Sequence, residues 1–332
     1  MMRRGLLLLN LGTPDNADIR AVKLYLHEFL TDKRVIDLPT IPRYILVYCL
    51  ILPFRSPKSA QAYQSIWTEK GSPLLYHSQN LVTKLQSSLK DEYKIALGMR
   101  YGTPSITTAL AELKDCHSLT ILPLFPQYSS AATGSAIEKT LSYLANQEII
   151  PSIKIIRDFY QRPEYIQAQA KIMKPYIKDN FHVLFSYHGI PERHIHKSGC
   201  DTLCPQTCTP IYDKNQACYR AQCYQTSLLL AKELQLGTHQ YTTAFQSRLG
   251  KTPWIKPYTD EIFAELISKG IKNIVVSCPS FVADCLETLE EIGIRAKEQW
   301  EKLGGEQFIL TPCMNDHPEW IKAIHSIVNE QI

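Results

Sequence analysis

The chain alternates short, continuous apolar runs with longer segments in which apolar residues recur at three- and four-residue spacings. Continuous apolar runs are typical of parallel strands covered on both faces, and the longer spacings predict amphipathic helices. The expected strands are residues 6–11, 93–99, 118–126, 152–159, 182–189, 241–247, 273–281 and 308–313. Repeated alternation of strands and helices predicts an α/β fold.

The expected strands divide equally between the two halves of the chain. The pattern therefore predicts two similar Rossmann-like lobes, each a four-stranded parallel sheet flanked by helices, with a cleft between them. We expect the lobes to comprise residues 1–165 and 166–332, because the strand pattern pauses near residues 160–175. Active sites in such folds lie beyond the carboxyl ends of strands.

The charge pattern and the N-terminus exclude several classes of protein. The net charge of +4, from 36 Lys and Arg against 32 Asp and Glu, is too small to indicate a nucleic-acid partner. The start, MMRRGLLLLNLGTPD, resembles a signal peptide, but Asn10 interrupts the apolar run and no cleavage site follows. We expect a cytoplasmic protein whose ten cysteines are thiols or metal ligands rather than disulfides.

The longest apolar run, Tyr44–Phe54, is too short to cross a bilayer, which takes roughly 20 residues. It fits either a buried helix or an apolar lip at a membrane surface. The flanking cations Arg43 and Arg55 favour the lip, because apolar residues beside positive charges suit an interface.

Nucleotide-binding motifs are absent from the sequence. The GKT that begins at Gly250 lacks the glycine that a phosphate-binding loop needs five residues earlier, where Phe245 stands. No GxGxxG follows the first expected strand, and no HExxH occurs. We therefore expect chemistry that needs neither ATP nor NAD.

A histidine and a row of acids follow two of the expected strands. His188 ends a strand, and alone it fits a structural residue, a proton acceptor or a metal ligand. Asp284, Glu287 and Glu291 follow the strand that ends at Phe281, at spacings that place their carboxylates on one helical face. They fit either a solvated face or a path of hard oxygen ligands for a divalent cation.

Other strand ends carry polar and aromatic residues. Arg100 could bind a carboxylate with two hydrogen bonds, and Tyr101 and Tyr128 offer flat faces with polar tips. Capping of the loops is the alternative for such residues.

Half of the cysteines gather in one short segment, 200–223, with none of the CxxC spacing of common zinc and redox sites. They are Cys200, Cys204, Cys208, Cys218 and Cys223.

Several stretches, in order along most of the chain, resemble the motifs of the ferrochelatase family. They are LLLLNLGTP, FRSPKSAQAY, GSPL, GMRYG, FPQYSSAATGS, FSYHGIPER, FQSRLGKTPWIKPYTDE and SCPSFVADCLETLEE. The resemblance implies a lyase that forms nitrogen–metal bonds by inserting Fe²⁺ into protoporphyrin IX, the terminal step of haem biosynthesis. It also implies a fold of two Rossmann-like lobes around a porphyrin cleft without a nucleotide.

The resemblance assigns roles to individual residues. His188 matches the family's active-site histidine and Glu287 its acidic partner, and both are expected to contact the Fe²⁺ substrate. Glu291 is expected to relay the metal. The division of roles between His188 and Glu287 stays open. The expected substrate-binding residues are Leu11, Arg55, Tyr63, Ser72, Arg100, Tyr101, Tyr128, Trp254, Phe281 and Asp284.

The resemblance also leaves alternatives. Some bacterial members hold a [2Fe–2S] cluster in an internal cysteine-rich segment, which is the expectation for 200–223, with Zn²⁺ or uncoordinated thiols as alternatives. The lip resembles that of protoporphyrin-using members and implies peripheral contact with the inner face of the cytoplasmic membrane. A coproporphyrin III ferrochelatase, a cobalt chelatase and a non-catalytic tetrapyrrole or metal carrier are the rival functions. The oligomeric state is not specified.

Overall fold

The computed structural model describes residues 3–90, 92–200, 203–204, 211, 215–248, 250 and 252–330. These residues form two compact units. The N-terminal unit contains the chain up to Phe125, residues Ser129–Asp158 and the end of the chain from Val328. The C-terminal unit contains Pro126–Tyr128 and Phe159–Ile327, so the division at Asp158–Phe159 lies a little before the one expected at residue 165.

The N-terminal unit is built on a parallel sheet of four strands in the order β2-β1-β3-β4. The strands are β1 (Arg4–Gly12), β2 (Tyr93–Tyr101), β3 (Ser118–Pro123) and β4 (Ser152–Ile155). The helices are α1 (Ile19–Leu30), α2 (Thr40–Ile45), η1 (Leu46–Ile51), α3 (Leu52–Ile66), α4 (Pro73–Leu89), α5 (Ile106–Glu112), η2 (Ser130–Gly134) and α6 (Ser135–Leu144).

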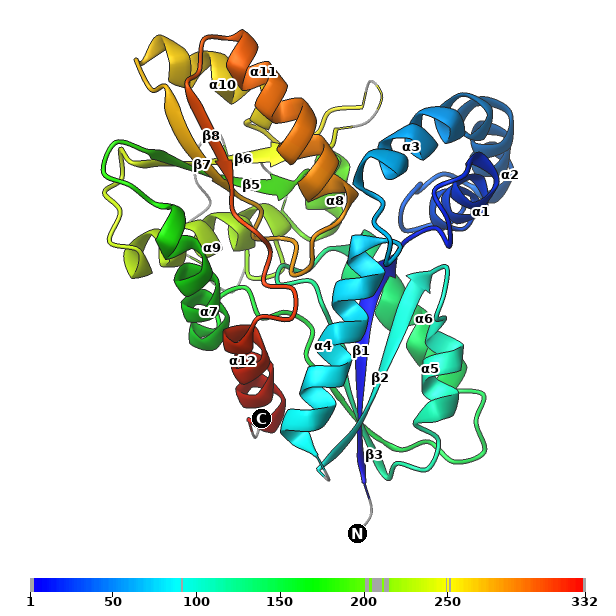
Figure 1. Ribbon diagram of the computed structural model, residues 1–332. Coiled ribbons are helices and arrows are strands. Elements are labelled where there is room, and N and C mark those ends of the chain that lie inside the picture. The colour runs from blue at the N-terminus through cyan, green and yellow to red at the C-terminus, as the bar shows by residue number, and fades with distance from the viewer. Residues whose placement is uncertain are drawn as a thin grey trace. The chain divides into compact units, whose positions relative to one another are not determined.

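The leucine run of β1 is buried on both faces of this sheet. Successive side chains of a strand point to opposite faces, so Leu7 and Leu9 pack with α5 and α6 in one core cluster. Leu6 and Leu8, also fully buried, face the other way, where α4 lies (Figure 1). The continuous apolar run therefore has the parallel, doubly covered environment that it predicts.

The C-terminal unit repeats this plan, with a parallel sheet in the order β6-β5-β7-β8. The strands are β5 (His182–His188), β6 (Tyr241–Gln246), β7 (Asn273–Ser277) and β8 (Gln307–Leu310). The helices are α7 (Pro163–Met173), η3 (Lys174–Tyr176), α8 (Glu192–Lys197), α9 (Tyr219–Glu233), α10 (Thr259–Ser268), η4 (Glu287–Ala296), α11 (Lys297–Lys302) and α12 (Pro318–Asn329).

The strand order places a topological switch point in each sheet. The second strand of each unit lies on one side of the first strand, and the third lies on the other side. Ligands of open α/β sheets bind at such switch points, beyond the carboxyl ends of the strands. In the C-terminal unit the switch point lies between β5 and β7, and His188 is the last residue of β5. The predicted fold class of two four-stranded parallel sheets flanked by helices is confirmed.

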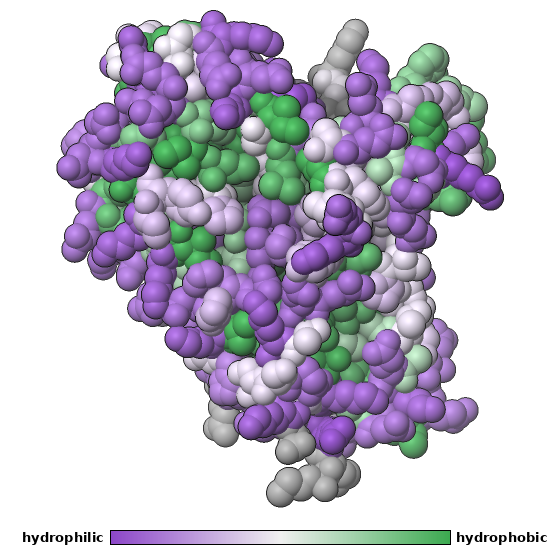
Figure 2. Space-filling view, in the orientation of Figure 1, coloured by the Kyte–Doolittle hydropathy of each residue, from purple (hydrophilic) through white to green (hydrophobic). Residues whose placement is uncertain are grey.

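The lip segment is exposed in the N-terminal unit. Val47 and Leu52 are buried against the unit, whereas other apolar side chains of 41–54 reach the surface. The exposed ones are Ile41, Tyr44, Ile45, Tyr48, Leu50 and Phe54. In Figure 2, hydrophobic residues lie among hydrophilic ones over α2 and α3. Within the described residues, no helix has an apolar stretch long enough to span a membrane.

Candidate active site

His188 presents one basic nitrogen of its imidazole. Its Nδ1 lies 2.6 Å from the carbonyl oxygen of Gly189. A carbonyl oxygen can only accept, so Nδ1 carries the proton and Nε2 of the neutral ring keeps its lone pair. Gly189 is required beside it, because a Cβ there would lie 2.8 Å from the backbone oxygen of Gln246.

Two aromatic side chains flank the imidazole. The ring centroids of Trp254 and Phe281 lie 6.4 and 6.2 Å from that of His188, and both rings are tilted to it by about 50–56°. Both side chains are half-buried. The sequence placed all three among the site residues, and the structure gathers them at the switch point of one sheet.

Glu287 and Glu291 lie on η4, a π-helix of ten residues. π-Helical segments are rare and are frequent at functional sites. The carboxylate of Glu291 accepts hydrogen bonds from the backbone N–H of Ser247 at 2.8 Å and from its hydroxyl at 2.5 Å. Ser247 follows β6 with φ of 67°, a left-handed conformation that costs energy for a non-glycine residue. In this conformation the backbone N–H of Ser247 points toward the Glu291 carboxylate.

The electrostatics of Glu291 connect it to the histidine. Burial raises the pKa of Glu291, and the charge of Glu287 acts in the same direction. The hydrogen bond from Ser247 and the charge of His188 oppose that rise. Glu291 therefore holds a proton at a higher pH than an exposed glutamate does, close enough to His188 and Glu287 for their charges to act on it.

Glu287 is held from two sides. Its backbone oxygen accepts a hydrogen bond of 2.9 Å from the side-chain amide of Gln246. The thiol of Cys285 hydrogen-bonds to its carboxylate, and burial followed by the charge of Glu287 raises the pKa of that thiol well above its usual value. A neutral S–H at this position donates to the carboxylate and leaves its second oxygen for a substrate.

Asp284 differs from the expected single acidic face. It precedes η4, is only 7% exposed, and its carboxylate accepts hydrogen bonds from the Asn315 side chain at 2.7 Å and the Thr288 hydroxyl at 3.2 Å. The backbone N–H of Cys313 also donates to it, at 3.3 Å. Its oxygens hold the start of η4, so the structure separates Asp284 from the acidic row that the spacing predicted.

A polar cavity of about 290 Å³ opens on the side of Glu291 that faces α10. Its lining includes Ser247, Arg248, Asp260, Arg295 and Gln299. Glu291 thus borders this cavity and is also close enough to His188 and Glu287 for their charges to act on it.

In the N-terminal unit, Arg100 and Tyr101 meet a carboxylate that the sequence analysis did not single out. Asp32 accepts hydrogen bonds from Arg100 at 2.5 Å, from the Tyr101 hydroxyl at 2.9 Å and from the Ser135 hydroxyl at 2.5 Å. Burial acts to raise the pKa of Asp32, but the hydrogen bonds from Ser135 and the Arg34 backbone, with the charge of Arg100, lower it.

This network changes what Arg100 and Tyr101 can do. Tyr101 is fully buried, and the guanidinium of Arg100 lies over its ring at 4.4 Å. A substrate carboxylate would have to compete with Asp32 for Arg100. The only signal for this pairing in the sequence is the charge of Asp32 itself, which stands two residues after the end of α1.

The other predicted substrate contacts are spread over both units. In the N-terminal unit, Leu11 and Arg55 are half-buried, and Ser72 bonds the Thr13 hydroxyl at 2.9 Å. Tyr63 is buried with its ring against Tyr25 and Trp67. In the C-terminal unit, the backbone N–H of Tyr128 donates to Gln222 of α9 at 2.6 Å. Their roles toward a substrate stay predictions.

Arg43 contradicts one detail of the predicted lip. It is only 8% exposed, and its guanidinium donates to the backbone oxygen of Leu38 at 2.9 Å. It therefore holds the chain before α2 and does not offer a charge at the surface.

The cysteine segment shows two environments. Cys200 and Cys204 are half-buried, whereas Cys218 and Cys223 are buried at the start of α9. Cys208 lies outside the described residues. Over the parts of the chain that the structure describes, no three His, Cys, Asp or Glu side chains are gathered closely enough to hold a metal ion.

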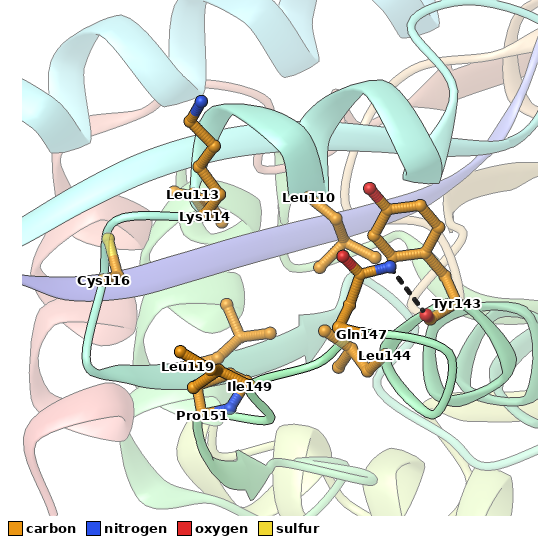
Figure 3. Close-up of a pocket in the computed structure, with 10 residues that line it drawn as sticks. All are labelled: Leu110, Leu113, Lys114, Cys116, Leu119, Tyr143, Leu144, Gln147, Ile149 and Pro151. Atoms are coloured by element: carbon orange, nitrogen blue, oxygen red, sulfur yellow. Dashed lines mark hydrogen bonds between the residues drawn. The ribbon is translucent and has the colours of Figure 1, made fainter.

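A separate small pocket of about 80 Å³ lies in the N-terminal unit between the ends of α5 and α6 (Figure 3). Its walls are mainly Leu110, Leu113, Leu119 and Leu144, and Gln147 closes one side by donating to the Tyr143 backbone oxygen at 3.3 Å. It carries no carboxylate or histidine, and we assign it no role in the chemistry.

Sequence reasoning missed the residues that hold the site, namely Gln246, Ser247, Ser280 and Cys285. The uncharged hydroxyl of Ser280 accepts a hydrogen bond of 3.0 Å from the backbone N–H of His188. Gln246 and Ser247 stand in the FQSRLGKTPW motif, which was the available signal for them.

Comparison with known proteins gives a consistent result. The family model described as Ferrochelatase matches residues 3–332. A ferrochelatase of Legionella pneumophila (strain Corby) is 99% identical over 331 residues and covers 100% of both chains. A ferrochelatase of Coxiella burnetii (strain Dugway 5J108-111) is 48% identical over 99% of this chain and 94% of its own length.

Solved structures extend the likeness of fold. SirB from Bacillus subtilis, solved with Fe³⁺, is similar with a TM-score of 0.55 and 12% identity, over 99% of this chain and 95% of its own. DR2241 from Deinococcus radiodurans, described as structurally similar to chelatases, has a TM-score of 0.52 and 11% identity, over 99% of this chain and 55% of its own. At these identities the likeness concerns the fold alone.

Proposed function

Since the chain belongs to the ferrochelatase family, we infer that it is a metal chelatase that inserts Fe²⁺ into protoporphyrin IX and releases two protons. This reaction is the terminal step of haem biosynthesis, yields protohaem and needs no nucleotide. The single observation that carries the inference is the position of His188 at the end of β5, at the switch point of one sheet, where Trp254 and Phe281 flank its ring. His188 is also close enough to the buried carboxylate of Glu291 for its charge to act there.

Metallation sets two demands that these residues meet. Two pyrrole N–H protons must leave as the metal binds four nitrogens, so a base must face the macrocycle. The Nε2 lone pair of His188 is free of the hydrogen bond that occupies Nδ1, and it can accept one proton. Carboxylates on the other side supply hard oxygen ligands for Fe²⁺ and a further proton acceptor.

Glu291 is suited to carry protons from the reaction site to bulk water. Its raised pKa lets it hold a proton at a higher pH than an exposed glutamate does, and the cavity that it borders contains polar side chains that can pass the proton on. The flat faces of Trp254 and Phe281 suit contact with a large aromatic ligand.

The test is porphyrin metallation followed by fluorescence, with Fe²⁺ or Zn²⁺, on wild type, His188→Ala and Glu287→Gln. We expect both variants to lose insertion while porphyrin still binds. His117→Ala changes an exposed histidine in the other unit and is the matched control. Normal turnover by His188→Ala would refute the assignment, and binding without turnover by wild type would indicate a carrier.

The choice of porphyrin needs its own measurement. The alternative is a coproporphyrin III ferrochelatase, which differs in the number of carboxylates on the substrate. We expect kcat/KM to favour protoporphyrin IX. The reverse ranking would establish the alternative.

We propose further that the exposed lip makes a peripheral contact with the inner face of the cytoplasmic membrane. Its apolar side chains are joined by Ile19 and Leu24, which are exposed on α1 next to Arg20 and Lys23. The segments α1 and α3 pack together, so these side chains belong to one region of the unit. Apolar side chains beside cations suit a bilayer interface.

Vesicle sedimentation tests this contact. We expect wild type to sediment with vesicles of phosphatidylglycerol and phosphatidylethanolamine, and Leu50→Ser with Phe54→Ser to abolish sedimentation. Ile149→Ser is the matched control, because Ile149 is 85% exposed in the same unit but lies outside the lip. Equal binding by the lip variant and wild type would rule out the lip.

For the cysteine segment we propose a [2Fe–2S] cluster held by Cys200, Cys204, Cys208 and Cys218. Cys223 is left out of this set because it is fully buried inside α9, whereas Cys218 directly precedes that helix. Four cysteines then remain, the number that such a cluster needs. A bound cluster would supply a redox-active link between the segment and α9, and no step of chelation passes through it.

The visible absorption of anaerobically purified protein, without porphyrin, tests the cluster. We expect bands of a [2Fe–2S] centre in wild type and in Cys223→Ser, and their loss in Cys218→Ser. A colourless protein with stoichiometric zinc would establish the zinc alternative. Loss of colour in Cys223→Ser alone would overturn the proposed ligand set.

A further inference from the structure

The peptide groups of His188 lie beyond the end of a neighbouring strand. In a parallel sheet, the N–H and C=O of one residue point toward the same neighbouring strand, and those of the next residue point to the opposite side. Gly189 donates to Gln246 of β6 at 2.7 Å, so the groups of His188 face the β7 side. On that side β7 ends at Ser277, which pairs with Phe185, and no strand of the described part of the chain reaches His188.

Two side chains from distant parts of the unit take the place of the missing strand. The His188 N–H donates to the Ser280 hydroxyl at 3.0 Å, and the Tyr219 hydroxyl donates to the His188 carbonyl oxygen at 2.8 Å. The peptide that joins His188 to Gly189 is therefore held at both ends, by Tyr219 at its oxygen and by Gln246 at its nitrogen.

Tyr219 is itself held rigidly. It is the first residue of α9, its ring is only 6% exposed, and its hydroxyl also bonds with Ser280 and Cys223. His188, Ser280 and Tyr219 thus close a small ring of hydrogen bonds around the backbone of the active-site histidine.

We propose that Tyr219 is a positioning residue for His188, fixing the His188–Gly189 peptide and with it the direction in which Nε2 points. This inference rests on the proposed chelatase function. The imidazole is tied to the same stretch of backbone through Nδ1 and the Gly189 oxygen, so rotation of the peptide turns the ring. Misplacement of a reacting group by about 1 Å can cost 100-fold in rate.

The position of Tyr219 gives this contact a second consequence. It directly follows Cys218, within the cysteine-rich segment 200–223. A movement of the start of α9 would reach the histidine through one hydrogen bond.

Tyr219→Phe removes only the hydroxyl, and Tyr187→Phe is its matched control. Tyr187 is a fully buried neighbour of His188 whose hydroxyl bonds the Ser227 side chain at 2.9 Å, away from the His188 peptide. We expect Tyr219→Phe to lower kcat by about 10- to 100-fold with the porphyrin KM unchanged, the pattern of a lost transition-state interaction. We expect Tyr187→Phe to keep the wild-type kcat.

The imidazole itself supplies a readout that is independent of catalysis. The Cε1–H NMR signal of His188, titrated with pH without porphyrin or metal, should shift in Tyr219→Phe and not in Tyr187→Phe. Ser280→Ala should reproduce the shift and covers the case in which Tyr219→Phe does not fold. An unchanged His188 signal and kcat in Tyr219→Phe, or equal losses in both tyrosine variants, would overturn the inference. Absent turnover in wild type with the NMR shift present would refute only the proposed function.

Discussion

The removal of Arg100 should destabilise the N-terminal unit far more than the removal of an ordinary ion-paired arginine. Arg100→Ala leaves the carboxylate of Asp32, whose side chain is 6% exposed, without its cation. Breaking a buried pair in this way costs about 3–5 kcal/mol, because the remaining charge stays desolvated. Ser135 and Tyr101 still donate to Asp32, which places the expectation toward the lower end of that range.

The matched control is Arg4→Ala. Arg4 also pairs with an acid, Glu92, at 2.8 Å, and its guanidinium also lies over a tyrosine ring, that of Tyr93, at 4.3 Å. It differs in exposure, since the Arg4 and Glu92 side chains are 41% and 53% exposed. Exposed pairs contribute about 0–1 kcal/mol, so this variant should unfold close to wild type.

Thermal unfolding measures the difference. At about 2–4 °C for each kcal/mol in a unit of this size, a loss of about 3 kcal/mol in Arg100→Ala should lower the Tm of the N-terminal unit by roughly 6–12 °C. The pKa of Asp32 is lowered below its ordinary value of 3.8 in the folded protein, so its contribution is present above that pH and is lost as the pH falls through the lowered pKa. The gap between Arg100→Ala and wild type should therefore persist to about pH 4 and close in stronger acid.

A variant Arg100→Ala as stable as Arg4→Ala, with a raised porphyrin KM, would refute this reasoning. That result would show that Arg100 is available to a substrate carboxylate and that Asp32 does not need it.

Three further predictions concern the C-terminal unit. Because the pKa of Glu291 is raised in the folded protein, the folded state binds the Glu291 proton more tightly than the unfolded state does. Wild type should therefore lose stability relative to Glu291→Gln as the pH rises from 4.5 through the raised pKa. Urea unfolding at a series of pH values measures this difference. Asp284→Asn should lower stability by about 1–3 kcal/mol, because Asn315 and its neighbours lose a charged acceptor, and an unchanged urea midpoint would contradict that role. Gly189→Ala should cost about 1–3 kcal/mol and reduce turnover, because its Cβ would press on the Gln246 oxygen, and full activity would show that the backbone can yield there.

The sequence determined the architecture because burial on two faces leaves a direct record in the chain. The run from Leu6 to Leu9 predicted a strand covered on both sides, and the equal division of the expected strands predicted two similar sheets. The same reasoning placed His188 at a strand end, where the sheet topology puts ligand sites. The apolar run of 44–54 was recognised as unusual, but its exposure needed the structure.

The partners of each polar group were decided only by the tertiary structure. Asp284, Glu287 and Glu291 look equivalent at helical spacing. Asp284, however, precedes η4, and its carboxylate oxygens accept hydrogen bonds from Asn315 and Thr288. Arg100 meets Asp32, which lies 68 residues away. Hydrogen bonds of this kind join residues that no local pattern relates, because they form between elements that the fold brings together. The hydrogen bonds of Tyr219 and Ser280 to the His188 backbone also join distant parts of the chain. They form because β5 extends beyond the end of β7.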